Sequence, residues 1–189
     1  MSIATAFTSF PTLITNRLHL RQIQPGDAEA IFAIRADEQV REAYGQEPYQ
    51  SLAEAHAMME RVQASYLRNK DLFWGITRKE NDTVIGSCTL WNFDTESLRC
   101  ELGYELNRAY WRQGIISEAV AAVLAYGFTE LGLHRIEAVV SGGNASSQKL
   151  LLKLGFTREG SLRQRSRFRG TFEDELYFGL LRDEWAKSV

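Results

Sequence analysis

Residues 110–120 read YWRQGIISEAV, a stretch that joins an expected strand to an expected helix. The segment before it, LRCELGYEL at 98–106, is typical of a strand, and the apolar residues after it recur at helical spacing. The first turn of a helix has unpaired backbone N–H groups and the positive end of the dipole, so residues 112–117 are a candidate anion site. The alternative is an ordinary helix start, in which Glu118 complements the dipole. Gly114 stands alone, so the stretch is neither a Walker loop nor a dinucleotide-binding fingerprint.

The segments around this stretch predict one α/β domain over residues 1–189 with a mixed sheet. The expected strands cover residues 17–23, 73–79, 83–93, 98–106, 135–140, 156–162 and 172–181. Four helices are expected. The first follows Asp27 as N-cap, and the second covers 51–67 with a Ser51/Glu54 capping box. The third runs from the opening stretch to about Leu131, and the fourth from Asn144 to about Leu154. The chain has no internal repeat, low-complexity run or linker.

The composition narrows the class of protein. With 22 Lys and Arg against 24 Asp and Glu, the chain lacks the basic excess of a general nucleic-acid binder. Cys88 and Cys100 have no CxxC spacing and are expected to be buried free thiols in a reducing compartment. His19, His56 and His134 are dispersed, so we expect no metal site. We see no signal peptide and no apolar run long enough for a bilayer, which predicts a cytoplasmic protein without a membrane partner.

Several pieces of the sequence occur together in a recognisable order. ELGYEL, YWRQGIISEAV, HRIEAVV and NASSQKLLLKLGFTREG resemble the GNAT superfamily of acyl-CoA-dependent N-acetyltransferases. The first and last segments, LITNRLHLRQIQPGDAEAI and RGTFEDELYFGLLRDEW, resemble its ribosomal-protein N-acetyltransferase (RimJ/RimL-like) branch. The resemblance implies the GNAT fold, with a mixed, mostly antiparallel sheet of about six to seven strands flanked by about four helices. It also implies transfer of an acetyl group from acetyl-CoA to a primary amine by direct attack in a ternary complex.

The resemblance assigns the opening stretch to the loop that cradles the pyrophosphate of coenzyme A. The residues so assigned are Arg112, Gln113, Gly114, Ile115, Ile116 and Ser117. The superfamily pattern is Gln/Arg-x-x-Gly-x-Gly/Ala, and two positions depart from it: Trp111 stands at the first and Ile116 at the last. Most phosphate contacts in such loops come from backbone N–H groups, so these changes need not abolish binding. A bulky Ile116 does leave less room above the loop.

Two carboxylates lie on the expected strand before the loop. Glu101 and Glu105 share a face of that strand with Gly103 between them, and a charged pair of this kind is often only a solvent-facing pair. By resemblance, a carboxylate at or near Glu101 is the general base, often through water, with Glu105 as the alternative. The backbone at Glu105 and Leu106 would bind the pantetheine arm.

The segment NASS at 144–147 has two interpretations. In one, Asn144 caps the helix and Ser147 is an ordinary polar residue in its first turn. In the other, Ser147 shares an inward helical face with Leu150, Leu151 and Leu154. By resemblance, Asn144 contacts the pantetheine arm or a bound water, and Ser147 hydrogen-bonds the leaving thiolate.

Other features leave alternatives open. An extended segment would show one basic stripe formed by Arg163, Arg165, Arg167 and Arg169. This stripe either protects an edge strand by charge or steers an acidic substrate or the 3′-phosphate of coenzyme A. Trp74 and Trp91 belong either to the core or to the wall of an acceptor pocket.

The acceptor is inferred from the resemblance alone, which favours the N-terminal α-amine of a protein. An α-amino group with a pKa near 8 is roughly a tenth neutral at pH 7, far more than a lysine, so it demands less of a base. A small-molecule amine, such as a polyamine, an amino acid or an aminoglycoside, is the alternative. A non-catalytic acyl-CoA-binding module is a second one. The branch often dimerises, so a homodimer is also considered.

Overall fold

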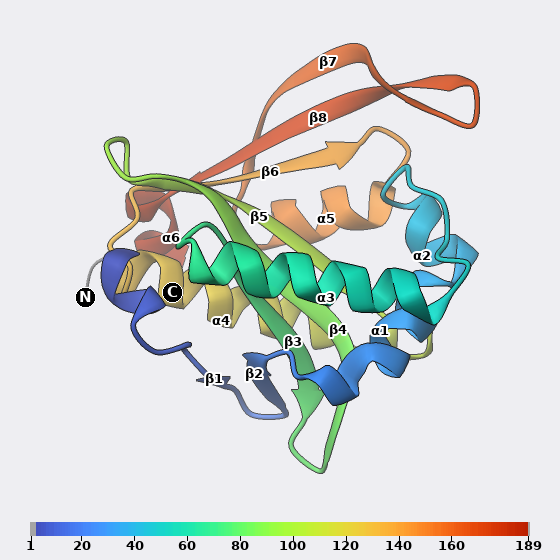
Figure 1. Cartoon of the computed structure of the whole chain (residues 1–189). Coiled ribbons are helices and arrows are strands. Elements are labelled where there is room, and N and C mark those ends of the chain that lie inside the picture. Colours follow the sequence, from blue (N-terminus) through green and yellow to red (C-terminus); the bar gives the residue numbers. More distant parts are fainter. Residues whose placement is uncertain (1–2, 189) are drawn as a thin grey trace.

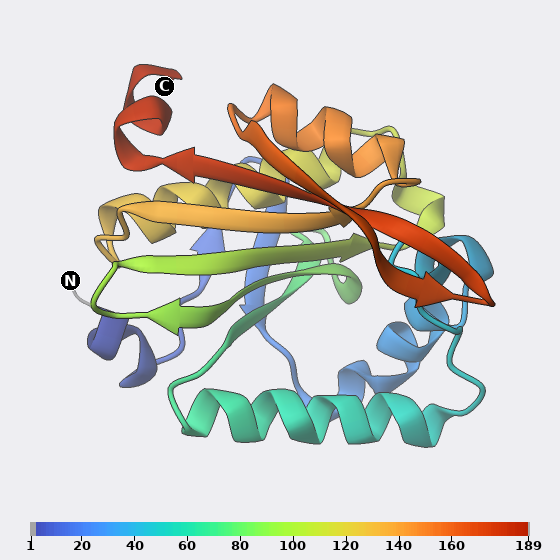
Figure 2. The same ribbon diagram turned by 90° about the horizontal axis from the view of Figure 1, so that it is seen from above.

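The computed structural model describes residues 3–188 and shows an open twisted sheet with helices on both faces (Figures 1 and 2). Its strands are β1 (Leu13–Ile14), β2 (Leu18–Gln22), β3 (Leu72–Arg78), β4 (Asn81–Asp94), β5 (Arg99–Leu106), β6 (Arg135–Ser141), β7 (Thr157–Phe168) and β8 (Thr171–Leu181). Its α-helices are α1 (Ala28–Arg35), α2 (Glu38–Glu42), α3 (Leu52–Leu67), α4 (Ile115–Thr129), α5 (Ala145–Lys153) and α6 (Arg182–Ser188). Short 3₁₀ turns occupy Ile3–Phe7, Pro25–Asp27 and Arg108–Tyr110.

The strand order in the sheet is β1-β2-β3-β4-β5-β6-β8-β7. Every recorded strand pairing is antiparallel except that of β5 with β6. The predicted α/β class and mostly antiparallel sheet are therefore confirmed. The described residues form slightly more elements than expected because β1, α2 and α6 are too short for a periodic sequence signal.

The helix expected after Asp27 differs from the prediction. It divides into α1 and α2, because Asp37 starts a second helix by accepting hydrogen bonds from the backbone N–H groups of Gln39 and Val40. Asp27 does not cap α1 with its side chain. Its carboxylate instead accepts from the Gln24 backbone N–H at 2.7 Å.

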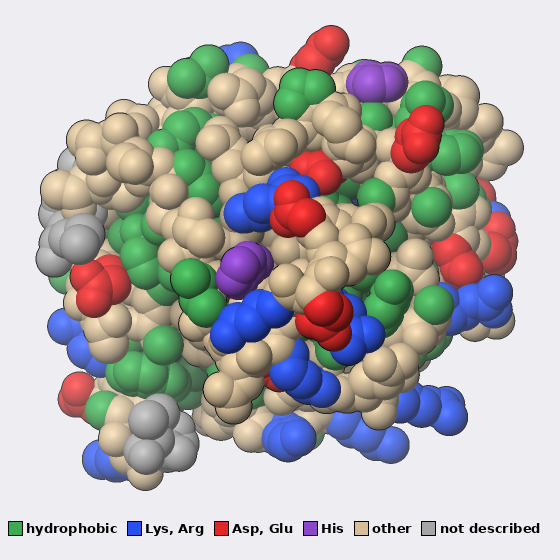
Figure 3. All heavy atoms as spheres, turned by 90° about the horizontal axis from the view of Figure 1, so that it is seen from below, with side chains coloured by type: hydrophobic (Ala, Val, Ile, Leu, Met, Phe, Trp, Pro, Cys, Tyr) green, Lys and Arg blue, Asp and Glu red, His purple; other side chains and the backbone are tan. Residues whose placement is uncertain are grey.

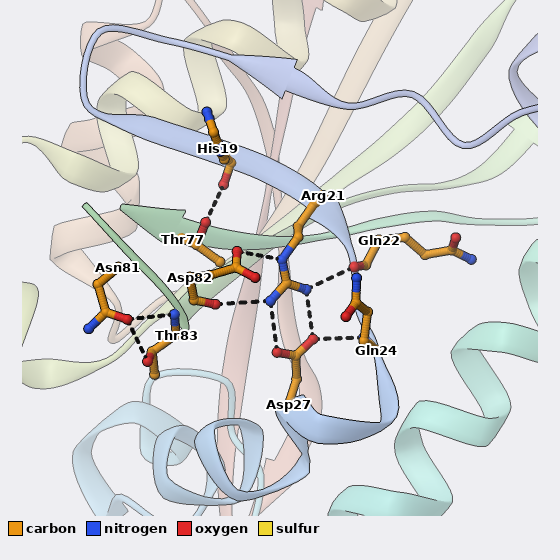
Figure 4. A network of polar contacts seen from close by, with 9 residues as sticks. All are labelled: His19, Arg21, Gln22, Gln24, Asp27, Thr77, Asn81, Asp82 and Thr83. Atoms are coloured by element: carbon orange, nitrogen blue, oxygen red, sulfur yellow. Dashed lines mark hydrogen bonds and ion pairs between the residues drawn. The ribbon is translucent and has the colours of Figure 1, made fainter. Parts of the chain in front are cut away.

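Arg21 explains why Asp27 is drawn away from the helix. Its guanidinium donates to both carboxylate oxygens of Asp27, at 2.8 and 2.9 Å, and to the Asp82 carboxylate at 2.8 Å (Figure 4). It also donates to the backbone oxygens of Gln22 and Asp82. The network joins β2, the turn before α1 and the start of β4. In the middle of the face seen from below, Lys and Arg side chains likewise touch Asp and Glu side chains (Figure 3).

The helices bury two apolar clusters on opposite faces of the sheet. On one face, Ile31 of α1 and Met58 of α3 pack with Phe73 and other buried residues. On the other, α4 and α5 contribute to the larger cluster, which includes Val120 and Leu151. Figure 2 shows α3 on one side of the strands and α4 and α5 on the other. Adjacent residues of β5 therefore face different layers.

Strands β5 and β6 separate soon after they begin. Their parallel pairing consists of Arg99–Arg135, Cys100–Ile136 and Glu101–Glu137 and does not continue beyond Glu101. Further along, β5 stays paired with β4 up to Leu106, and β6 with β8 up to Ser141. The sheet is thus open between the two strands over the second half of β5.

Candidate active site

A cavity of about 460 Å³ lies where β5 and β6 separate. Leu102 to Leu106 line it from β5, and Ala138 to Ser141 line it from β6. The start of α4, the first turns of α5, the end of α2 and the β7–β8 hairpin complete its wall. Because these elements belong to both faces of the sheet, the cavity lies between the two layers at the level of the strands.

The loop before α4 forms one end of the cavity. Arg112, Gly114, Ile115 and Ile116 line it, whereas Gln113 and Ser117 do not. Gly114 has φ +75° and Arg112 has φ +60°, a left-handed conformation that glycine adopts at little cost. The first backbone N–H groups of α4 have no partner within the helix, so this end suits an anion.

Contacts with the turn between β1 and β2 hold the loop in place. Glu118 accepts hydrogen bonds from the Arg17 backbone N–H at 3.0 Å, the Arg17 Nε at 2.7 Å and the Thr15 hydroxyl at 2.6 Å. Arg17 also donates to the Gln113 carbonyl at 3.0 Å. Gln113 directs its own side chain to the Ala109 carbonyl. Glu118 therefore anchors the helix start, a larger role than the dipole partner expected from the sequence.

Glu105 is buried beside the cavity among positive charges. It is 7 % exposed, and its Oε1 accepts from the Arg35 Nε at 2.8 Å and from the Ser87 hydroxyl at 3.2 Å. A guanidinium nitrogen of Arg41 lies 4.0 Å from Oε2. Burial acts to lower the pKa of Arg35, but Glu105 and the Tyr49 hydroxyl leave it raised. Burial and the neighbouring Arg35 lower the pKa of Arg41.

Glu101 is not among the residues that line the cavity. Its Oε1 accepts from the Asn92 amide at 2.7 Å, and its backbone is still paired with Glu137. The sequence was right that Glu101 and Glu105 share a face, but β5 and β6 part only after Glu101. The structure therefore brings Glu105 to the cavity and not Glu101, which had been the first choice as base.

Asn144 and Ser147 occupy the first turn of α5. The Asn144 side chain accepts from the Ser147 backbone N–H at 3.0 Å and donates to the Ala43 carbonyl at 3.0 Å. Asn144 thus caps the helix and ties it to the end of α2, while also lining the cavity. The Ser147 hydroxyl lies 2.7 Å from the Tyr104 hydroxyl, and both residues line the cavity. The inward orientation expected for Ser147 is confirmed.

Two carboxylates of β8, Glu173 and Glu175, also line the cavity. Glu173 accepts from the Ser141 hydroxyl at 2.7 Å, and Glu175 accepts from the Tyr177 hydroxyl at 3.4 Å. Neither carboxylate has an ion pair among the residues that the structure describes. Tyr44 also lines this region, and the atoms packed around its phenol, together with Glu105, raise its pKa well above the ordinary value.

The predicted arginine stripe is broken. Between Leu162 and Ser166, β7 contains two residues more than the paired part of β8, and Gln164 there has φ +53°. Alternation is lost at such a bulge. Arg167 lines the cavity, whereas Arg169 lies beyond the end of β7 and forms ion pairs.

The partners of Arg169 are Glu38 and Glu47, at 2.5 and 2.6 Å. These contacts join the tip of the β7–β8 hairpin to α2 and the loop after it, a proximity visible in both ribbon views (Figures 1 and 2). The tip itself is a tight turn with positive φ at Arg169 and Gly170.

Of the two alternatives for Trp74 and Trp91, the structure does not support the wall of an acceptor pocket. Trp74 is fully buried and donates to the Pro11 carbonyl at 2.7 Å, and Trp91 is not part of the cavity wall. Trp111, by contrast, lines the cavity. Its indole N–H donates to the Leu106 carbonyl at 2.8 Å, which fixes the loop against the end of β5. Sequence reasoning noted Trp111 only as a departure from a pattern.

The cysteines lie where the sequence indicated. Cys88 and Cys100 are buried and free, and burial raises the pKa of both thiols. Within residues 3–188, no three His, Cys, Asp or Glu side chains are grouped as metal ligands. In the same range, no helix combines the length and apolar character needed to cross a membrane.

Comparisons with known proteins agree with this geometry. Residues 17–157 match the family model described as an acetyltransferase (GNAT) domain. The chain is 40% identical over 173 residues to the uncharacterized N-acetyltransferase YoaA of Bacillus subtilis, covering 92% of this chain and 98% of YoaA. It is 38% identical to the uncharacterized N-acetyltransferase p20 of Bacillus licheniformis, covering 93% of this chain and 98% of p20. A match of 24% identity covers 92% of this chain and 92% of the [ribosomal protein uS5]-alanine N-acetyltransferase of Escherichia coli.

Solved structures share the fold. The GNAT-family acetyltransferase of Bacillus anthracis aligns with a TM-score of 0.81 and 24% identity, covering 92% of this chain and all of that one. The spermidine N-acetyltransferase of Vibrio cholerae, solved with CoA and spermine, aligns with a TM-score of 0.81 and 22% identity over 91% of this chain and 99% of that one. The cavity between diverging strands, the start of α4 in its wall and the family match lead to one conclusion. The chain belongs to the GNAT family and is an acetyl-CoA-dependent acetyltransferase.

Proposed function

We propose that this enzyme acetylates a primary amine by direct attack in a ternary complex, and that the acceptor is the N-terminal α-amine of a protein. The observation that carries the proposal is the cavity between β5 and β6. Its wall includes the start of α4, the side chains of Ser147 and Glu105, and the carboxylates of Glu173 and Glu175. An acyl donor and an amine can therefore meet within it from different layers of the molecule.

The residues around the loop fit acetyl-CoA. The backbone N–H groups of residues 112–117 would hold the pyrophosphate, with Gly114 supplying the left-handed turn. The backbone of Glu105 and Leu106 and the side chain of Asn144 would flank the pantetheine arm. The Leu106 carbonyl already accepts from Trp111, which leaves fewer groups free there than the sequence implied. Bound acetyl-CoA supplies the thioester, whose carbon–sulfur bond breaks as the amine nitrogen bonds to the acetyl carbon.

Glu105 is the proposed proton acceptor, directly or through a water. It lines the cavity, and Arg35, Arg41 and Ser87 fix its orientation. Ser147 is the proposed hydrogen-bond donor to the leaving sulfur. No cysteine lies in the cavity wall, so attack without a covalent acyl-enzyme is proposed.

A relative and the pKa of an α-amine both support a protein N-terminus as the acceptor. One relative is, by its name, an alanine N-acetyltransferase of ribosomal protein uS5. An α-amine also needs less help from a base than a lysine does. A second candidate, a small polycationic amine, is favoured by Glu173 and Glu175, which line the cavity without ion pairs among the described residues.

The experiment is thiol release from acetyl-CoA with defined acceptors. Peptides with free N-termini, the same peptides with blocked N-termini, spermidine, amino acids and aminoglycosides are offered in parallel. Turnover with free but not blocked peptides supports the first acceptor, and turnover only with spermidine supports the second. Thermal stabilisation by acetyl-CoA without turnover of any amine would identify a non-catalytic acyl-CoA-binding module.

The proposal also includes where and in what form the enzyme works. A cytoplasmic location agrees with two buried, free cysteines, since a reducing compartment keeps thiols unpaired. A homodimer is proposed from the resemblance to the RimJ/RimL-like branch. Sedimentation at several protein concentrations tests the dimer.

A further inference from the structure

We propose that Tyr104 is a positioning residue that orients the Ser147 hydroxyl as a hydrogen-bond donor to the sulfur of bound coenzyme A. This inference rests on the proposed function and adds a residue that sequence reasoning did not single out. It follows from the 2.7 Å contact between the two hydroxyl groups in the cavity wall.

Both hydroxyl groups are held firmly by their surroundings. The Tyr104 ring is partly buried against the large apolar cluster between the sheet and α4. Ser147 lies in the first turn of α5, where Asn144 binds its backbone N–H at 3.0 Å. Asn144 in turn donates to the Ala43 carbonyl, so the start of α5 is fixed relative to α2. The contact between Tyr104 and Ser147 is therefore built from three separate elements: β5, α5 and α2.

The direction of the hydrogen bond decides what Ser147 can do. The geometry allows either hydroxyl group to donate. The proposal requires that the Tyr104 O–H donates and the Ser147 Oγ accepts, a direction favoured because a phenol is more acidic than an aliphatic alcohol and is therefore the better donor. Ser147 then keeps its own proton for a third group in the cavity. Burial raises the pKa of Tyr104 to about 12, so the phenol stays protonated and remains a donor throughout the neutral range.

The position on β5 separates two tasks. Glu105 and Tyr104 are consecutive residues of a strand, so they point to opposite faces. Glu105 contacts Arg35 of α1 on one face, and Tyr104 contacts Ser147 of α5 on the other. Proton acceptance from the amine and stabilisation of the departing sulfur are thus assigned to different faces of the same strand.

The chemical balance of the step is simple. The amine nitrogen gains a bond to the acetyl carbon and gives one proton to Glu105 or water. The carbon–sulfur bond breaks, and sulfur keeps its electron pair. Ser147 donates a hydrogen bond to that sulfur while Tyr104 donates to Ser147. A donor that is itself hydrogen-bonded in this way is strengthened, because bonds in such chains polarise one another.

The main test measures the pKa of the coenzyme A thiol in the bound state, followed by ultraviolet absorbance of the thiolate. The proteins compared are the wild type, Tyr104→Phe, Ser147→Ala and the double variant. Tyr126→Phe is the matched control, because Tyr126 is a partly buried tyrosine of α4 outside the cavity. We expect the bound thiol to have a lower pKa in the wild type and the control than in the two single variants. The double variant should match Ser147→Ala.

Turnover gives a second readout. Loss of a hydrogen bond to a charged sulfur should lower kcat about tenfold to a hundredfold in Ser147→Ala. Tyr104→Phe should lower kcat by a smaller factor and leave KM for acetyl-CoA nearly unchanged. The two effects should not multiply in the double variant, because Tyr104 acts only through Ser147.

Several outcomes overturn the inference. They are a bound thiol that titrates as it does free in solution, a Tyr104→Phe protein with wild-type thiol pKa, or effects on kcat that multiply. Circular dichroism and melting of each variant separate loss of folding from loss of positioning. If coenzyme A binds with the expected thiol pKa but no amine is acetylated, the proposed function fails while the role of Tyr104 stands.

Discussion

Glu105→Gln tests whether the charge of this buried carboxylate holds two arginines in place. Glu105 is 7 % exposed and Arg41 5 %, and Arg35 lies 2.8 Å from the carboxylate. Removing the negative charge leaves both guanidinium groups without a counter-charge at this site. Breaking a buried ion pair by removing one partner costs about 3–5 kcal/mol. Glutamine keeps the shape and one acceptor oxygen, so we expect the lower end, about 3 kcal/mol.

The assay is urea unfolding together with the melting temperature. For a domain of this size, about 3 kcal/mol corresponds to a decrease in Tm of roughly 6–12 °C. Glu101→Gln is the matched control, since it removes a carboxylate from the same strand. Its contact with Asn92 survives in the amide, so its free energy of unfolding should change by no more than about 0.5 kcal/mol.

A double variant sharpens the test. Arg35→Gln combined with Glu105→Gln removes one positive and one negative charge, so it should recover part of the stability lost in Glu105→Gln alone. If Glu105→Gln and Glu101→Gln unfold at the same urea concentration, the reasoning from buried charge is refuted. The reasoning is also refuted if the double variant loses as much free energy of unfolding as the two single variants added together.

Three further predictions concern the loop, the acid side of the stability profile and the hairpin. Gly114→Ala forces alanine into φ +75°, so it should raise KM for acetyl-CoA and cost about 1–2 kcal/mol in urea unfolding; an unchanged KM would count against the cradle. The hydrogen bond from Arg21 lowers the pKa of Asp82, so this pair stabilises the fold above the unfolded pKa of Asp and stops doing so as pH falls through the lower folded value. Asp82→Asn should therefore lower Tm at neutral pH, and the difference should shrink as pH falls through the lowered folded pKa of Asp82; a constant difference across pH would contradict this. Arg169→Ala should speed proteolysis at the β7–β8 tip, whereas Arg165→Ala, an exposed neighbour with no ion pair among the described residues, should not; equal rates would show that the ion pairs do not hold the tip.

Local sequence patterns predicted most of the fold. The alternation in ELGYEL and the helical spacing after Gly114 depend on neighbouring residues only, and both elements form where expected. The Asn144 cap and the end of α5 before Gly155, which has φ +90°, follow from equally local chemistry. The break between α1 and α2 and the bulge in β7 could not be predicted in this way. A single capping residue causes the first and a change of register the second, and neither leaves a periodic signal in the sequence.

The site was only partly predictable because its contacts join distant segments. Alternation places Glu101 and Glu105 on one face, but the point where β5 leaves β6 decides which one meets the cavity. Arg35 reaches Glu105 from α1, and no spacing rule relates the two. Tyr104 faces the opposite layer from both carboxylates, and its partner Ser147 lies 43 positions further along the chain, so no local pattern relates the two residues.

The short parallel junction between β5 and β6 also affects the mechanics of the molecule. Three residue pairs join β1–β5 to β6–β8 along the sheet, and α4 contacts β4, β5 and β6 from one side. The sheet therefore consists of two parts, β1–β5 and β6–β8, which share a core but are joined to each other only over a short, easily deformed stretch. A ligand in the cavity would contact both parts of the sheet, so its binding should slow hydrogen exchange in β6 and β8, outside the loop proposed to hold the pyrophosphate.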